Sequence, residues 1–245
     1  MRKLIVLLSL CFAVGNLFAQ TADSSQLKSQ GDQALQAKNY PVAFTKYSQY
    51  LKQTNYQDSI TAFNCGVCAD RTKKYDAAAK MFDVAIKKNY NVASAYVGKA
   101  VAYRNLMKNS DYIATLKEGM EVVPGNASIE KLYAIYYLKE GQAFQKSSNI
   151  DKAEESYMHV TDVSSKKWKT DALYSLGVLF FNDGALVLKK AAPLASSNPD
   201  KYKEEKATAD ADFKKADEYL EKAVALSPER TEIAKLLTQV KSSMN

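Results

Sequence analysis

Hydrophobic residues recur at helical spacing along most of the chain, and one ladder of small and large apolar residues appears several times. After Gly66, Tyr75, Ala78, Phe82 and Ala85 follow one another in steps of three and four, which places them on one face of a helix. Similar ladders follow Gly31, Gly141 and Gly177, and together they predict an all-α chain of paired antiparallel helices. The four series are Tyr75, Ala78, Phe82, Ala85 and Ile86; Tyr40, Ala43, Tyr47, Tyr50 and Leu51; Ile150, Ala153, Tyr157 and Val160; and Phe213, Ala216, Leu220, Ala223 and Val224.

Each ladder starts at a glycine inside the first helix of a pair. Glycine costs roughly 1 kcal/mol relative to alanine in a helix, so its recurrence indicates that the second helix packs closely on the first. Gly98 fits the same role only if the turn after it is two residues longer, and its ladder then reads Tyr112, Leu116, Gly119, Met120 and Pro124. One pair cannot bury its apolar face alone, so the pairs must stack.

In these positions the chain resembles the tetratricopeptide repeat (TPR) family, whose period is about 34 residues. The resemblance implies a right-handed α-solenoid of about five helix-turn-helix repeats with a C-terminal capping helix at 229–244. Ser227 is the expected N-cap of that last helix, with Pro228 in its first position. The repeats are expected at about 24–57, 59–90, 91–125, 129–165 and 170–228.

The last repeat contains an insertion at about 183–210. Gly177 and Phe213 stand 36 residues apart where intact repeats have nine, so 27 residues are added. Helical spacing continues on both sides of the insertion, which predicts an extended helical hairpin. About 12 extra residues on each helix would project roughly 18 Å at about 1.5 Å per residue. A flexible polar loop is the alternative.

The first nineteen residues have the features of a secretory signal peptide. Arg2 and Lys3 precede an apolar run from Leu4 to Val14, and Ala19 offers a small residue for cleavage before Gln20. The run is shorter than the roughly 20 apolar residues of a membrane span. We therefore expect export to the periplasm or cell surface, a repeat domain over 20–245, and no membrane-spanning segment after cleavage.

The mature chain is mildly basic. The sequence has 34 lysines and arginines against 27 acidic residues, and removing Arg2 and Lys3 leaves a net charge of +5. Nine basic residues fall within 71–108, against Asp76 and Asp83. This segment is either a solvated outer face or a surface that steers an acidic partner or binds anionic wall or membrane material. The export signal argues against nucleic acid as a partner.

Catalytic patterns are missing from the sequence. His159 is the one histidine, and no phosphate-binding glycine loop follows a strand, so no catalytic residue, cofactor or metal site is predicted. Cys65 and Cys68 form a C-x-x-C pair. They flank Gly66 inside a helix, where packed thiols or a local disulfide are expected rather than a redox centre. We predict that the chain is not an enzyme, with a thiol-redox enzyme as the least favoured hypothesis.

The resemblance also implies a concave groove, lined by the first helices, that binds a peptide or protein partner. A lysine–asparagine clamp for a terminal carboxylate, which some family members use, is not expected because Asp32 and Val92 replace groups that it needs. The predicted function is an exported interaction scaffold in a cell-envelope assembly; the alternative is an envelope component that binds anionic material through 71–108. The expected groove combines apolar anchors with basic residues: Phe63, Val67, Arg71, Lys99, Tyr103, Leu138, Lys146, Tyr174, Val178 and Phe181.

Overall fold

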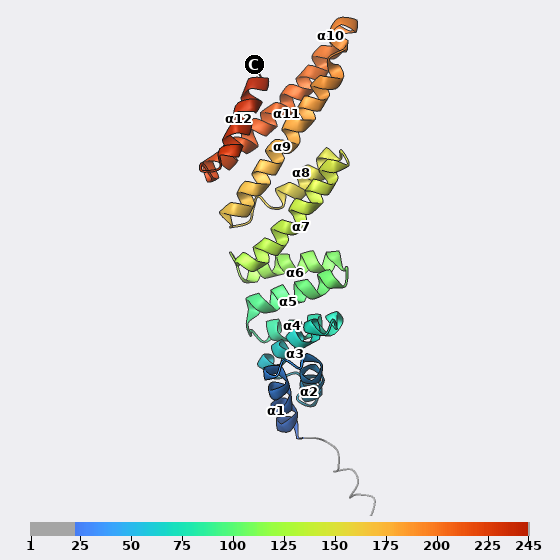
Figure 1. Cartoon of the computed structure of the whole chain (residues 1–245), viewed down its shortest axis with the longest axis vertical. Coiled ribbons are helices and arrows are strands. Elements are labelled where there is room, and N and C mark those ends of the chain that lie inside the picture. The colour runs from blue at the N-terminus through green and yellow to red at the C-terminus, as the bar shows by residue number, and fades with distance from the viewer. Residues whose placement is uncertain (1–22, 245) are drawn as a thin grey trace, which may run out of the picture. The chain divides into compact units, whose positions relative to one another are not determined.

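The structure, a computed structural model, describes residues 23–244, and this part of the chain is helical without a strand. The predicted signal peptide at 1–19 lies outside the described residues. Figure 1 labels the helices of the described residues. The chain divides between Thr115 and Leu116 into two compact units. The expectation of an all-α fold built from helix pairs is confirmed.

In the first unit, each helix packs against the next along the chain, from α1 to α5. This stacking buries the apolar faces that single hairpins would leave exposed. The helix α6 (Asn109–Val122) contains the division between the units. The helices before it are α1 (Ser24–Gln36), α2 (Tyr40–Gln53), α3 (Ser59–Arg71), α4 (Tyr75–Lys87) and α5 (Val92–Asn105).

The turns after α1, α3 and α5 share one conformation. Each has three residues, and the middle one is left-handed, with φ of 55° at Lys38, 60° at Lys73 and 57° at Met107. The residue that follows donates its N–H back into the first helix, as Lys108 does to the carbonyl of Tyr103 at 3.0 Å. The turn after α5 is therefore as short as the others, and our expectation of a longer turn there was wrong.

Gly98 packs differently from the other glycines, which explains that error. A Cβ atom at Gly66 would meet Phe82, sixteen residues later in its own helix pair, whereas a Cβ at Gly98 would meet the same ring from the next pair. Counting sixteen residues back from Leu116 gives Ala100, which is fully buried. Ala100 therefore carries the repeat register in the third pair, 34 residues after Gly66. The groove positions counted from Gly98 shift by two residues.

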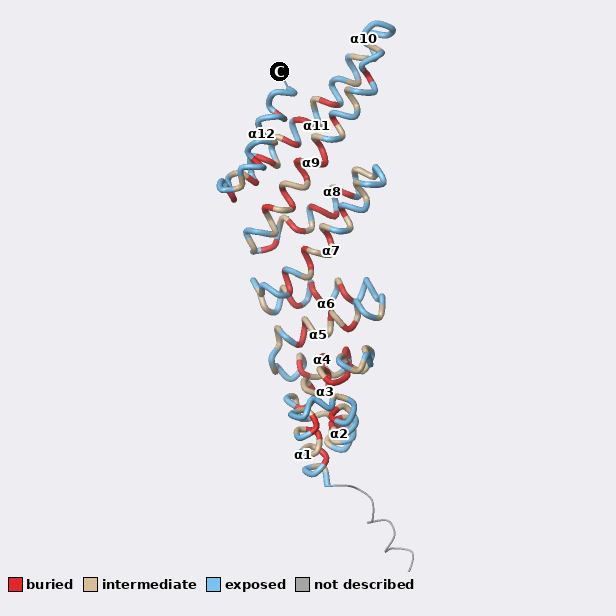
Figure 2. The backbone as a smooth tube through the Cα atoms, viewed as in Figure 1, coloured by how far each residue is buried: buried red, intermediate tan, exposed pale blue. Residues whose placement is uncertain are grey.

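The core of the first unit consists mostly of alanines with aromatic residues between them, so that helices approach closely while rings fill the gaps. Buried stretches alternate with exposed ones along each helix (Figure 2). One cluster lies between α1, α2 and α3, and another between α3, α4 and α5. The first comprises Ala34, Ala43, Tyr47, Leu51, Ala62, Cys65 and Cys68, and the second Ala69, Ala78, Ala79, Phe82, Ala85, Ala95 and Ala102.

Asp58 joins the first two helix pairs through a polar network. As N-cap of α3, it accepts hydrogen bonds from the backbone N–H and the hydroxyl of Thr61, both at 2.9 Å, and from Tyr50 at 3.1 Å. The ammonium of Lys28 on α1 lies 2.6 Å from the same carboxylate. Burial raises the pKa of Asp58, but these donors outweigh burial and hold it at about 2. The charge of Lys28 is thus paired with that of Asp58.

In the second unit, α7 packs on α8, α8 on α9, and α11 along both α9 and α12. Aromatic and leucine side chains from these helices form one buried cluster around Phe180, Phe213 and Leu220. The helices are α7 (Ala127–Lys146), α8 (Ile150–Met158), α9 (Lys166–Ala191), α10 (Leu194–Ser197), α11 (Pro199–Leu226) and α12 (Thr231–Ser243).

The pair α7 and α8 departs from the pattern of the first unit. α1 and α3 begin seven residues before their packing glycines, whereas α7 begins fourteen before Gly141. Its extra two turns contain Glu130 and Tyr133. α8 is short, with nine residues against 13 or 14 in α2 and α4, and an irregular segment at 159–165 leads from it to α9. The added turns of α7 lie beside this segment.

The insertion in the last repeat forms the extended hairpin that was predicted. α9 continues to Ala191, and α11 begins at Pro199, fourteen residues before Phe213. Gly184 lets the two helices approach closely, because a Cβ there would lie 3.0 Å from the carbonyl oxygen of Ala209. The short helix α10 occupies the tip.

One sequence expectation about this unit needs correction, and one helix has a property that was not predicted from the sequence. By length and composition α9 could cross a membrane, which was not expected. It packs along α11 and contributes Leu176 and Phe180 to the buried cluster, as the core helix of a globular fold does. Ser227 does not cap the last helix: it follows the end of α11, its hydroxyl lies 3.1 Å from that of Thr170, and α12 begins only at Thr231.

Candidate functional site

The predicted groove residues of the first unit are largely engaged in packing. The ring of Phe63 meets Phe82 edge-on at a centroid distance of 5.6 Å. Val67 and Tyr103 also pack against the cluster between α3, α4 and α5. Arg71 is exposed, and its guanidinium lies over the ring of Tyr40 at 5.9 Å. Arg71 therefore remains the accessible cation of this group.

Lys99 faces α4 in the structure. Its ammonium lies 2.6 Å from Asp83, and only 14% of its side chain is exposed. Asp83 also pairs with Lys87 at 2.7 Å. This position follows from the two-residue shift in register at Gly98, and it means that the charge of Lys99 is neutralised within the protein.

In the second unit, Leu138, Tyr174 and Phe181 are partly buried against the central cluster. The guanidinium of Arg230 lies 5.7 Å from the ring of Tyr174 and 2.6 Å from Asp171, which ties α9 to the chain before α12. Val178 is half-buried. Lys146 is exposed, and in the described part of the chain it has no carboxylate partner. The ten predicted residues thus form two groups, one in each unit.

The basic segment 71–108 is partly neutralised. Lys87 and Lys99 pair with Asp83, and Lys108 lies 3.2 Å from Asp76. The ammonium of Lys74 lies 4.4 Å from the ring centroid of Phe44. The segment therefore presents less free positive charge than its sequence suggests.

Cys65 and Cys68 are free thiols buried in the cluster between α1, α2 and α3. Burial raises the pKa of Cys65 to about 11 and that of Cys68 to about 12. Because the thiolate is the reactive form, this environment opposes nucleophilic and redox chemistry at the pair.

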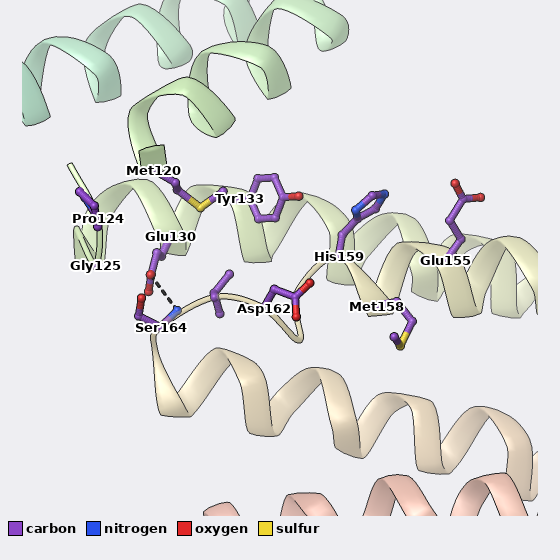
Figure 3. A pocket seen from close by; sticks show the side chains of 11 residues that line it. Met120, Pro124, Gly125, Glu130, Tyr133, Glu155, Met158, His159, Asp162 and Ser164 are labelled. Carbon is purple, nitrogen blue, oxygen red and sulfur yellow. Dashed lines mark hydrogen bonds between the residues drawn. The ribbon is translucent and has the colours of Figure 1, made fainter. Parts of the chain in front are cut away.

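The second unit contains a pocket of about 450 Å³ beside the added turns of α7 (Figure 3). Tyr133 and His159 lie in a row along it, with Asp162 facing them from the segment after α8. No lysine or arginine is part of its wall. The lining residues are Met120, Pro124, Gly125, Glu130, Tyr133, Glu155, Met158, His159, Asp162, Val163 and Ser164.

Glu130 fixes the shape of this pocket. Its side chain is buried, and its two carboxylate oxygens each accept a backbone N–H at 2.9 Å, from Ser164 and Ser165. Such charge-assisted hydrogen bonds are among the stronger ones in proteins. Glu130 therefore holds the segment after α8 against α7, and its role is structural.

His159 is the first residue of the irregular segment, at the C-cap of α8. The centroid of its ring lies 4.2 Å from the ring centroid of Tyr137. Burial lowers its pKa, with the nearby charge of Lys117 acting in the same direction and Glu155, Glu140 and Asp162 opposing both. The imidazole is accordingly neutral at pH 7.

The pocket was not predicted. From the sequence, His159 was assigned to no site and the added turns of α7 were not identified. A signal was present, because Ala100 and Gly141 stand 41 residues apart where the other packing positions stand 34 to 36 apart. The seven surplus residues are those that bring Glu130 and Tyr133 to the pocket.

Comparison with solved structures identifies the family. A TPR repeats protein from Bacteroides fragilis is 68% identical to this chain, and the match covers 91% of this chain and 99% of that chain with a TM-score of 0.89. The chain therefore belongs to the tetratricopeptide repeat family. YrrB, described as a TPR protein with an unusual peptide-binding site, is 16% identical over 90% of this chain and 92% of its own, with a TM-score of 0.42. No protein-family model and no curated protein sequence matches the chain.

Proposed function

We propose that the chain is an exported scaffold that binds a protein or peptide partner on the faces of its first helices, within a cell-envelope assembly. Membership in the TPR family carries this proposal, because stacked helix pairs present large surfaces suited to binding extended or helical segments. The peptide-binding site described for YrrB is a property of that protein, and it agrees with this use of the fold.

Two observations support the first helices as the binding faces. Phe63, Tyr103 and Tyr174 are anchored by packing yet partly accessible, and rigid aromatic residues lose little entropy on binding. Arg71 and Lys146 add accessible positive charge to α3 and α7. A partner with apolar and acidic side chains fits this combination.

The partner can be captured from envelope extract with the mature chain as bait. Arg71→Glu with Lys146→Glu should slow association several-fold, because charges at an interface rim act mainly on encounter rates. The matched control is Lys52→Glu with Lys214→Glu, which reverses two exposed lysines on second helices. Equal loss in both double variants, or sedimentation with purified cell wall and no protein partner, would contradict the proposal.

Export is tested separately. The chain produced with its own N-terminus should appear outside the cytoplasm with an intact mass that lacks residues 1–19. A full-length mass in the cytoplasmic fraction would contradict export while leaving the scaffold function in place.

A further inference from the structure

His159 lines two hollows in the second unit. The first is the pocket of Figure 3, the second has a volume of about 350 Å³, and Glu155 and His159 line both. Together they lie within the size range of pockets that bind small groups. The first is lined by Glu130 and Tyr133 from the added turns of α7, and both are lined by Glu155 and His159 near the end of the short α8.

The walls carry an excess of negative charge. Four carboxylates line the two hollows: Glu130, Glu140, Glu155 and Asp162. The single lysine in the lining, Lys152, has its ammonium 5.5 Å from the ring centroid of Phe144. This is a local reversal of sign in a chain whose formal net charge is +7.

The four carboxylates fall into two kinds. Glu130 accepts two backbone N–H groups, and Glu140 accepts hydrogen bonds from the hydroxyls of Tyr136 and Ser156, both at 3.1 Å. Glu155 and Asp162 are exposed, and no cation of the described residues pairs with them. Two carboxylates thus build the walls, and two remain available to a ligand.

Aromatic residues make up part of the remaining lining. The ring centroid of Tyr137 lies 4.8 Å from that of Tyr133 and 5.1 Å from that of Tyr136. The centroid of the His159 ring lies 4.2 Å from that of Tyr137. Aromatic faces attract cations through their quadrupole, and they do so most strongly where water is excluded. Free carboxylates beside a wall of rings are complementary to a planar cation.

We propose that this pocket binds the guanidinium group of an arginine side chain that a protein partner presents. Arginine fits better than lysine, because its planar group is weakly hydrated, stacks on rings and can bridge two carboxylates. Glu155 and Asp162 are the groups that pair with it, and the aromatic residues around His159 supply the neighbouring ring surface. The inference rests on the proposed scaffold function, and it names one side chain of the partner.

The single histidine gives a direct test by NMR. The untagged mature protein is titrated with N-acetyl-arginine amide while the His159 ring proton resonances are followed. The matched probe is N-acetyl-citrulline amide, which has nearly the same shape and no charge. We expect a saturable shift with the arginine compound and binding about tenfold weaker with the citrulline compound, as for the loss of a charged hydrogen bond.

Variants localise the effect. Glu155→Gln and Asp162→Asn should each reduce the arginine-dependent shift, whereas Glu204→Gln, an exposed carboxylate on α11, should leave it unchanged. Circular dichroism checks that each variant is folded. Equal responses to arginine and citrulline, an equal response to N-acetyl-lysine amide, or a full response in the double variant Glu155→Gln with Asp162→Asn would overturn the inference. Because this titration uses no partner, its failure would not affect the outcome of partner capture.

Discussion

Gly98 on α5 lies directly against the ring of Phe82 on α4. A Cβ atom added at Gly98 would come within 2.5 Å of the ring Cζ, and one added at Gly66 would come within 3.0 Å of the ring Cε1. One phenyl ring therefore fills the space between its own helix pair and the next. Close packing of this kind leaves no room for a methyl group at Gly98 and little room for one at Gly66.

Gly98→Ala should destabilise the protein by about 1 to 3 kcal/mol, as overpacking of a core does. Alanine favours a helix by roughly 1 kcal/mol over glycine. A loss in stability would therefore show that the clash with Phe82 outweighs the gain in helix propensity. Urea unfolding measures the difference. Ser94→Ala, an exposed change on the same helix, should be nearly neutral. Gly98→Ala at or above wild-type stability would contradict the contact.

Glu130→Ala should cost about 1 to 3 kcal/mol, because two N–H groups lose their acceptor in a buried place. Glu130→Gln should cost less, since one carbonyl oxygen remains. Thermal melts compare both with Glu121→Ala, which removes an exposed carboxylate from α6. If Glu130→Ala and Glu121→Ala had the same melting temperature, Glu130 would not stabilise the segment 159–165.

Asp58 should make stability depend on acid. Its pKa is about 2 in the folded chain and about 3.9 when unfolded, so its contribution is present above about pH 4 and lost as pH falls towards about 2. Asp58→Asn should be less stable than wild type near neutral pH, by on the order of 1 kcal/mol after solvent screening. The two stabilities should converge near pH 2. A constant difference from pH 2 to pH 6 would be the contrary result.

His159 should titrate below its ordinary value of 6.5, because burial and the charge of Lys117 both oppose its protonation. Since the unfolded chain takes up this proton first, stability is highest above about pH 6.5 and falls as pH drops through the folded pKa. NMR titration of the single histidine gives the midpoint. Lys117→Gln should raise that midpoint, and Glu155→Gln should lower it. A midpoint at or above 6.5 in wild type would show that the ring is not shielded.

Cys65 and Cys68 should be almost inert in the native protein. With pKa values raised to about 11 and 12, the thiolate fraction at pH 8 falls by about a hundredfold or more. Labelling by an aromatic disulfide reagent should therefore be slow until urea unfolds the chain. Rapid labelling of both thiols under native conditions would restore the redox hypothesis.

The paired helices were predictable because their signal is local. Gly66 and Phe82, or Gly141 and Tyr157, are fixed partners within one hairpin, so their spacing reports a contact directly. The prediction for the third pair was wrong because Gly98, close to the expected position, packs against the preceding helix pair. Ala100 stands at the position that the packing glycine has in the other pairs. Residue type alone does not show which neighbour a small side chain faces.

The candidate site was less predictable, because it depends on packing between repeats. The resemblance to the TPR family predicted that Lys99 lines the groove. In the structure its ammonium forms an ion pair with Asp83 on α4. The pocket beside His159 arises from two added helical turns, which look in sequence like any other helix. Only the 41-residue interval from Ala100 to Gly141 marks them.

The long hairpin of α9 and α11 also provides a place where the chain of the second unit can be cut. Its tip, residues 192–198, is almost wholly exposed, whereas Phe180, Phe213 and Leu220 far from the tip hold the two helices together. Exposed tips of this kind accept cuts and insertions best. A break at the tip would leave two pieces with complementary apolar faces, and we expect these pieces to reassemble when they are supplied as separate fragments.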